Sequence, residues 1–125
     1  MQDSIKTLGK FSDTRGVLVP LEMSDIPFTP KRLFYVYDVP VGTWRGGHAH
    51  YKTEQILICV KGKIGVKLES KKYNTEIILN EGDFCFVDKM VWDSQNFIDE
   101  GSILLVLCST NFDKTDYIFD KNLVV

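Results

Sequence analysis

The sequence has few of the residues that form disulfide bonds or structural metal sites in small proteins, with only three cysteines and two histidines among 125 residues. The cysteines, Cys59, Cys85 and Cys108, stand singly inside apolar stretches and show no CxxC spacing. A disulfide scaffold and a cysteine-based zinc site are therefore excluded. We expect reduced thiols in the core of a cytoplasmic protein.

The sequence also lacks blocks of like charge and long apolar runs. Its net charge is -2, with both signs scattered along the chain, so neither nucleic acid nor a membrane surface is an expected partner. The longest apolar runs, Ile56 to Val60 and Ile103 to Cys108, are too short to span a bilayer. A phosphate-bearing small molecule remains a suitable ligand, because a few local Arg or Lys side chains suffice to hold it.

The remaining composition is that of an ordinary globular protein, with 44% hydrophobic and 26% charged residues. The length is close to the commonest size of one domain, and the sequence shows no linker, low-complexity tract or internal repeat. We therefore expect residues 1–125 to form a single domain.

Short apolar or alternating runs rich in Val, Ile, Phe and Tyr recur along the chain, separated by turns rich in Gly, Asn, Asp and Lys. This pattern predicts an all-β fold of antiparallel sheets, as a barrel or a sandwich, without a long helix. The expected strands are Val17 to Leu21, Arg32 to Asp38, Gln55 to Val60, Lys63 to Glu69, Glu76 to Leu79, Phe84 to Val87 and Ser102 to Ser109.

The two histidines form the chemically most informative pattern, Arg45-Gly46-Gly47-His48-Ala49-His50. Residues two apart in a strand point to the same face, so a strand here would project both imidazoles together and turn Ala49 away. The alternative is that two surface histidines happen to be neighbours. The double glycine favours a functional pair, because glycine is used where the backbone bends sharply or approaches a ligand.

Metal binding is a second alternative, because an HxH pair followed by Glu54 offers three ligands. The spacing from Gly42 through the histidines to Glu54 resembles the first motif of the cupin barrels. In a second cupin motif starting at Gly82, a final histidine is due near position 93, where this chain has Asp93. Since that ligand is missing, we expect no metal and no other cofactor.

Further motifs, in order, extend the likeness from about residue 10 to residue 120. The whole set resembles the sugar 3,4-ketoisomerases of the cupin superfamily, and the Arg45 to His50 element is its most specific part. The other matching segments are Asp13-Thr14-Arg15-Gly16, Ile26-Pro27-Phe28, Lys31 to Tyr35, Gln55, Trp92 and Asp116-Tyr117-Ile118, with departures at Asp88 and Phe112.

The resemblance implies a small cupin-type (jelly-roll) β-barrel that isomerises dTDP-4-keto-6-deoxy-D-glucose to the 3-keto sugar, a step toward dTDP-3-amino-3,6-dideoxyhexoses of surface polysaccharides. It also implies a homodimer with exchanged N-terminal strands. By the same resemblance His48 and His50 are catalytic, and Tyr35 and Arg45 line the pocket. The pairing Arg15-Gly16 resembles the branch that forms the galacto product.

Several side chains suit substrate binding, although each also has an ordinary structural role. Arg15, Lys31 and Arg32 are candidates for the diphosphate. Trp92 and Tyr117 would stack on the thymine or simply fill the barrel mouth. Arg32, Arg45 or the Tyr35 hydroxyl would stabilise an enediolate.

Three other functions remain open at this stage. A metal-dependent cupin oxygenase, a nucleotide-sugar epimerase and a non-catalytic sugar-binding cupin would each carry the same barrel.

Overall fold

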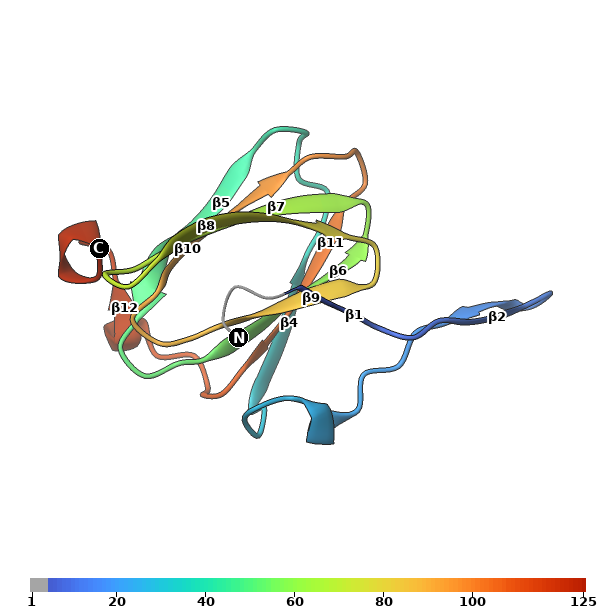
Figure 1. The fold of residues 1–125 in the computed structure, drawn as a ribbon, viewed down its shortest axis with the longest axis horizontal. Helices are drawn as coiled ribbons and strands as arrows, with labels where there is room; N and C mark the ends of the chain where they lie inside the picture. Colours follow the sequence, from blue (N-terminus) through green and yellow to red (C-terminus); the bar gives the residue numbers. More distant parts are fainter. Residues whose placement is uncertain (1–4) are drawn as a thin grey trace.

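The computed structural model describes residues 5–125, and over that range the regular elements are antiparallel β-strands and short 3-10 helices. One five-stranded sheet has the order β1 (Ile5–Thr7), β9 (Asp83–Val87), β6 (Gln55–Lys61), β11 (Ile103–Cys108) and β4 (Arg32–Val36). The other has the order β12 (Tyr117–Ile118), β5 (Trp44–His50), β10 (Trp92–Phe97), β7 (Lys63–Glu69) and β8 (Asn74–Asn80). Figure 1 shows the two sheets facing each other as the walls of a barrel.

The remaining elements lie outside the barrel walls. β2 (Phe11–Asp13) and β3 (Gly16–Leu18) form a separate two-stranded hairpin. The 3-10 helices are η1 (Met23–Asp25), η2 (Lys114–Asp116) and η3 (Lys121–Leu123). Among the described residues no helix is long and apolar enough to cross a membrane.

The core fills the space between the sheets with inward-facing side chains from both. Leu57 of β6, Leu68 of β7 and Phe97 of β10 are at most 2% exposed and belong to one hydrophobic cluster. Each such buried side chain stabilises the fold by roughly 1.5–3 kcal/mol relative to exposure.

The three cysteines are free and buried, as the sequence predicted. Burial raises the pKa of Cys59 and of Cys85 to about 12. Since the thiolate is the reactive form, these thiols serve packing and offer no nucleophile at neutral pH.

The predicted all-β, antiparallel fold is confirmed, and six of the seven expected strands match observed strands to within two residues at each end. The first expected strand, Val17 to Leu21, ends earlier, at Leu18, because the chain leaves the hairpin there. β10 was not predicted, since its segment Trp92-Asp93-Ser94-Gln95-Asn96-Phe97 places polar residues at inward positions.

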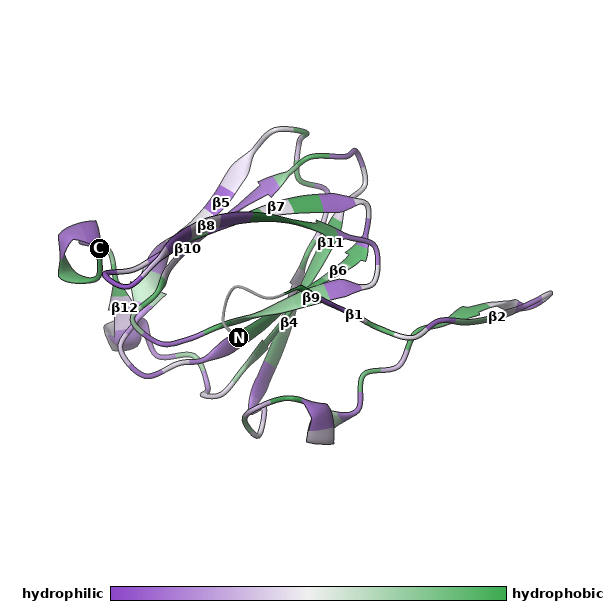
Figure 2. Cartoon of the chain, in the orientation of Figure 1, coloured by the Kyte–Doolittle hydropathy of each residue, from purple (hydrophilic) through white to green (hydrophobic). Residues whose placement is uncertain are grey.

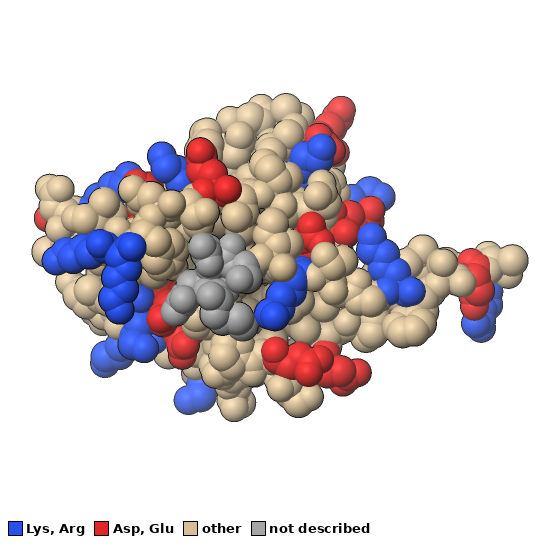
Figure 3. All heavy atoms as spheres, in the orientation of Figure 1, with Lys and Arg blue, Asp and Glu red and all other residues tan. Residues whose placement is uncertain are grey.

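The β2–β3 hairpin projects away from the barrel, at the end opposite β12 (Figure 1). Its apolar side chains face solvent: Phe11 is 65% exposed, Val17 63% and Leu18 61%. Figure 2 shows hydrophobic residues on this hairpin as well as on the central strands of the barrel. Lys, Arg, Asp and Glu are interspersed on the face in Figure 3, so that face carries no extended field of one sign.

Candidate active site

The two histidines lie on one face of β5, as the HxH spacing predicted. Their ring centroids are 5.0 Å apart in an edge-on arrangement. Ala49 points to the opposite face, where it is fully buried against Ile118 and Val124. The strand therefore presents both imidazoles to the same space.

Pairing with two neighbouring strands completes the surroundings of the histidines. On β10, Asp93 is the register partner of His48, and on β12, Tyr117 is the register partner of His50. The Tyr117 ring centroid lies 4.9 Å from that of His48 and 4.6 Å from that of His50. Phe119 stacks on Tyr117 and is 73% exposed, so an aromatic surface continues from the imidazoles to solvent.

The double glycine before the histidines has a local structural cause. Gly46 and Gly47 adopt φ of 78° and 75°, in the left-handed region that other residues avoid. A Cβ at Gly46 would stand 2.9 Å from Gln95 Oε1 and 3.0 Å from the Asp93 carbonyl oxygen. β5 and β10 also change register at Asp93 and Ser94. Glycine is thus required where β5 passes closely over the buried polar residues of β10.

The Asp116-Tyr117-Ile118 motif joins the end of the chain to this site. The buried Asp116 carboxylate accepts hydrogen bonds from the Lys52 and Thr53 backbone N–H groups and from Thr53 Oγ1 at 2.5 Å. This anchor holds the loop that follows β5. Tyr117 then faces the histidines, and Ile118 is 1% exposed in the core.

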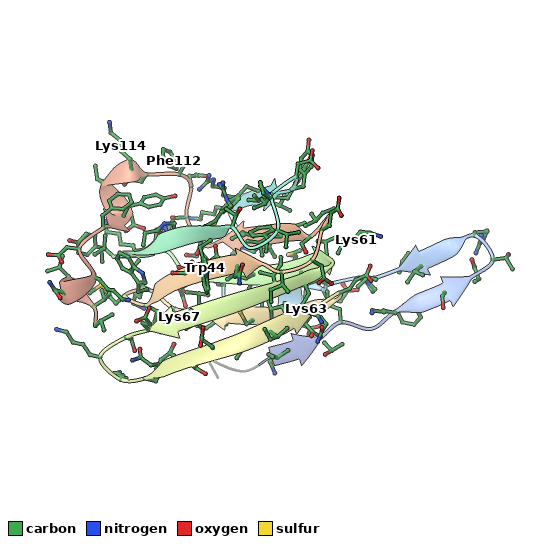
Figure 4. The ribbon with its side chains drawn as sticks, turned by 90° about the horizontal axis from the view of Figure 1, so that it is seen from above. Trp44, Lys61, Lys63, Lys67, Phe112 and Lys114 are labelled. Carbon is green, nitrogen blue, oxygen red and sulfur yellow. The ribbon has the colours of Figure 1, made fainter. Side chains whose placement is uncertain are left out.

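Two arginines approach the histidines. Arg32 lies over the rings of Phe34 and Phe112, at 4.7 Å and 5.2 Å from their centroids. It lines a small crevice together with His50 and Tyr117. Phe112 lies at the end of the barrel that also carries Lys114 and β12 (Figures 1 and 4).

Arg45 lines a cavity of about 80 Å³ inside the barrel together with His48, Asp93, Gln55 and Gln95. At roughly 30 Å³ per water molecule, this cavity has room for two or three waters. It is too small for a nucleotide sugar.

Burial controls the charge state of the imidazoles. Desolvation lowers the pKa of His50 to about 4, and the neighbouring His48 and Arg32 act in the same direction. Desolvation likewise lowers the pKa of His48 below its ordinary value. Both imidazoles are therefore neutral at pH 7 and able to accept a proton.

Asp93 is the site residue that the sequence interpretation missed. Its side chain is 2% exposed, and desolvation raises its pKa to about 7, while the hydrogen bond from Gln95 opposes this shift. Position 93 was read as a lost metal ligand, yet ligand atoms of His48, His50 and Asp93 all lie within 4.8 Å of one another. Glu54, which the spacing suggested as a third ligand, is not in this group.

A family profile described as FdtA, WxcM-like, C-terminal, matches residues 1–124 of the chain. The chain belongs to this FdtA family. A relative in Aneurinibacillus thermoaerophilus, TDP-4-oxo-6-deoxy-alpha-D-glucose-3,4-oxoisomerase, is 35% identical over 120 residues, which cover 94% of this chain and 86% of the relative.

Solved structures agree with this assignment. A 3,4-ketoisomerase from Helicobacter canadensis has a TM-score of 0.87 and 34% identity, covering 98% of this chain and 94% of that one. The sugar 3,4-ketoisomerase QdtA from Thermoanaerobacterium thermosaccharolyticum, in complex with TDP, has a TM-score of 0.86 and 34% identity, covering 95% and 88%. The family and the fold class that the motifs predicted are confirmed.

Not every predicted site residue of this FdtA-family chain lies beside the histidines. Tyr35 is 59% exposed and stacks on Tyr37, because β4 alternates and turns Phe34 and Val36 inward instead. Trp92 packs against the cluster of Ala49, Ile118 and Val124, on the opposite face of β10 from Asp93. The site formed by this one chain therefore includes neither Tyr35 nor Trp92.

The other predicted cations and Gly16 also lie apart from the imidazoles. Lys31 is exposed and is held by its backbone, whose N–H donates to the Cys108 carbonyl oxygen at 2.9 Å. Arg15 and Gly16 lie at the tip of the β2–β3 hairpin, where the Arg15 guanidinium pairs with Asp13 at 2.6 Å and its side chain is 88% exposed. Of the residues predicted to bind substrate or to act with the histidine pair, three lie beside the histidines within one chain. They are Arg32, Arg45 and Tyr117.

Replacing Asp93 by asparagine is expected to stabilise the FdtA-family protein at neutral pH but not at pH 4. The folded-state pKa of Asp93, about 7, lies above the ordinary value of 3.8. The contribution of Asp93 to the free energy of unfolding is therefore fully present below pH 3.8 and is lost as pH rises through 7. This loss is on the order of 4 kcal/mol. Asparagine has nearly the same shape and never ionises.

The measurement is the melting temperature of both proteins from pH 4 to pH 8, with the exposed Asp25→Asn variant as the matched control. The difference in favour of Asp93→Asn should grow with pH. A difference that is independent of pH would show that the pKa of Asp93 is not raised in the folded protein.

Proposed function

We propose that this protein catalyses the 3,4-ketoisomerisation of dTDP-4-keto-6-deoxy-D-glucose to the dTDP-3-keto-6-deoxy sugar, through an enediolate. The observation that carries the proposal is the pair of neutral imidazoles on one strand, 5.0 Å apart, in a chain of the FdtA family. The relative in A. thermoaerophilus is named for this reaction.

The reaction needs proton transfers at both carbon and oxygen. A base removes the proton at C3 beside the C4 carbonyl, a proton moves from O3 to O4, and C4 then receives a proton. His48 and His50 are proposed as the groups that exchange the carbon protons. Their neutral state at pH 7 leaves a ring nitrogen free to accept.

The enediolate intermediate carries negative charge, which fixed cationic donors would stabilise. Arg32 is the best placed, because it borders His50 and is held between two phenyl rings. Arg45 borders His48 from the other side of the pair. Tyr117 and Phe119 would offer their aromatic faces to the sugar or to the thymine.

A homodimer in which the β2–β3 hairpins are exchanged is the proposed assembly. An isolated two-stranded hairpin is marginally stable in water, and this one exposes Phe11, Val17 and Leu18. At the base of the hairpin an apolar groove of about 640 Å³ runs over the outer face of the β6 and β11 sheet. A second copy would cover both surfaces. β1 stays with its own barrel through β9, so the exchange concerns only the hairpin.

Such a dimer would also place the remaining predicted site residues near a substrate. Arg15 and Gly16 lie at the hairpin tip, far along the arm from their own barrel (Figure 1). We propose that they reach the partner's site and contact the substrate there. Tyr35, on the outer face of β4, and Lys31 would likewise act only where the second copy meets this face.

A metal-dependent reaction is the second candidate, because His48, His50 and Asp93 form a set of three donors that transition metals accept. We favour proton transfer without a metal, because a pair of neutral imidazoles can accept and donate protons without one and the relatives carry isomerase names. Turnover that survives exhaustive chelation would exclude the metal reading, and turnover restored only by an added ion would favour it.

The experiment that tests the function is incubation of the protein with dTDP-4-keto-6-deoxy-D-glucose, with the product identified by NMR. A 3-keto product is expected. A 4-keto product altered at C3 or C5 would indicate an epimerase instead, and an unchanged but bound sugar would indicate a binding protein.

We further propose a galacto product, a cytoplasmic location and a place in the synthesis of dTDP-3-amino-3,6-dideoxyhexoses.

A further inference from the structure

Asp93 has a free carboxylate oxygen beside the two imidazoles. Gln95 Nε2 donates to its Oδ1 at 2.5 Å. Its Oδ2 is buried and has no hydrogen-bond partner within the part of the chain that is described. A buried, unpartnered polar atom costs free energy, so its presence beside the imidazoles calls for an explanation.

The surroundings limit what that function can be. The titratable groups around Asp93 are His48 and His50 on β5, Cys85 on β9 and Cys108 on β11, and Arg45 borders the same cavity. The buried thiols have raised pKa values and do not exchange protons readily near pH 7. The imidazoles are thus the groups with which Oδ2 can exchange a proton.

The proposed reaction raises the question of which group supplies the C4 proton in a site with two neutral imidazoles. The imidazolium formed at C3 can pass its proton to C4 itself, but if the second, neutral imidazole protonates C4 instead, that imidazole gives up its own N–H proton. A third group must then replace this proton. The enzyme must also return to its starting state before the next turnover.

We propose that Asp93 lends this proton and takes it back, acting through the two imidazoles, an inference that rests on the proposed isomerase function. One imidazole removes the C3 proton and becomes imidazolium, while the sugar becomes the enediolate. The other imidazole delivers a proton to C4 as it accepts one from the Asp93 carboxyl group, so that no imidazolate is formed. The imidazolium then returns the C3 proton to the Asp93 carboxylate, so every group regains its starting state.

The geometry suits this role. The donor and acceptor atoms of the three groups lie within 4.8 Å, which is within reach of one bridging water, and the adjoining cavity has room for such a water. Gln95 fixes one carboxylate oxygen and leaves the other to exchange. Burial raises the pKa of Asp93 to about 7, so the carboxyl group can hold and release a proton near neutral pH.

The test compares wild type with Asp93→Asn, and with Ser94→Ala as a control on the opposite face of β10. We expect Asp93→Asn to lower kcat by about tenfold to a hundredfold with KM unchanged. Deuterium exchange at C3 of the recovered substrate in D2O should persist, because that step needs only the first imidazole. The ratio of C3 exchange to product formation therefore rises. Ser94→Ala should match wild type in all three quantities.

A fall of exchange and turnover by the same factor, or unchanged turnover, would overturn the proposal. If Asp93→Asn does not fold, infrared spectroscopy of wild type decides, with aspartate labelled by 13C. A protonated-carboxyl band near pH 7 that changes when substrate is added supports the relay, and its absence refutes it. Wild type that leaves the sugar unchanged would instead refute the isomerase function, whatever the infrared result.

Discussion

His48→Asn and His50→Asn are each expected to lower kcat by roughly a hundredfold to ten-thousandfold, the usual contribution of a positioned acid or base. Asparagine approximates the size of the imidazole and still forms hydrogen bonds, but it cannot accept a proton from carbon. The two rings lie 5.0 Å apart on one face of β5, and both are neutral at pH 7. Loss of either one removes half of the proposed proton transfer.

Steady-state kinetics at pH 7 measures this effect, and TDP binding by calorimetry checks that the nucleotide site is intact. Tyr51→Phe is the matched control, because Tyr51 follows His50 directly and is 48% exposed. A variant that binds TDP normally but does not turn over would exclude the binding-only alternative. Turnover within threefold of wild type for either histidine variant would contradict the assigned roles.

Mixing two inactive variants is expected to restore about a quarter of wild-type activity if the hairpin serves the partner's site. Arg15→Ala lacks the guanidinium on the arm, whereas His50→Asn lacks the imidazole in the barrel. With random pairing half of the dimers are hybrids, and each hybrid has one site with both groups intact. The exposed position of Arg15, away from its own histidines, is the reason to expect this result.

The control is a mixture of His48→Asn with His50→Asn. Both substitutions lie in the same barrel, so no hybrid of these two contains an intact site, and activity should stay at background. The dimers must first be dissociated and refolded together, and their mass should be checked by light scattering. Equal activity in both mixtures, or a monomeric mass, would contradict the exchanged dimer.

Local sequence patterns were sufficient to predict most of the fold. Apolar or alternating runs in the sequence predicted the strands β6, β7 and β11. The isolated cysteines within apolar stretches were correctly predicted to be core residues. The HxH spacing placed both imidazoles on one face, because the two-residue period of a strand holds regardless of its neighbours.

The features of the site that the sequence did not predict depend on contacts between distant segments of the chain. Asp93 looked like a lost ligand, and only the pairing of β10 with β5 shows that it lies opposite His48. The two-residue spacing of Asp93, Gln95 and the apolar Phe97 is the sequence signal that would have indicated a strand with these side chains on one face. Tyr35 was assigned to the pocket by resemblance, whereas the alternation of β4 turns it outward within one chain.

The most direct test of the proposed function is proton NMR of chelator-treated protein with dTDP-4-keto-6-deoxy-D-glucose in D2O. We predict a 3-keto sugar that carries deuterium at C4 and is formed without added metal, and product formed in H2O should show the C4 proton couplings of a galacto sugar. An unchanged sugar, a 4-keto epimer or turnover that appears only after a metal is added would contradict this prediction.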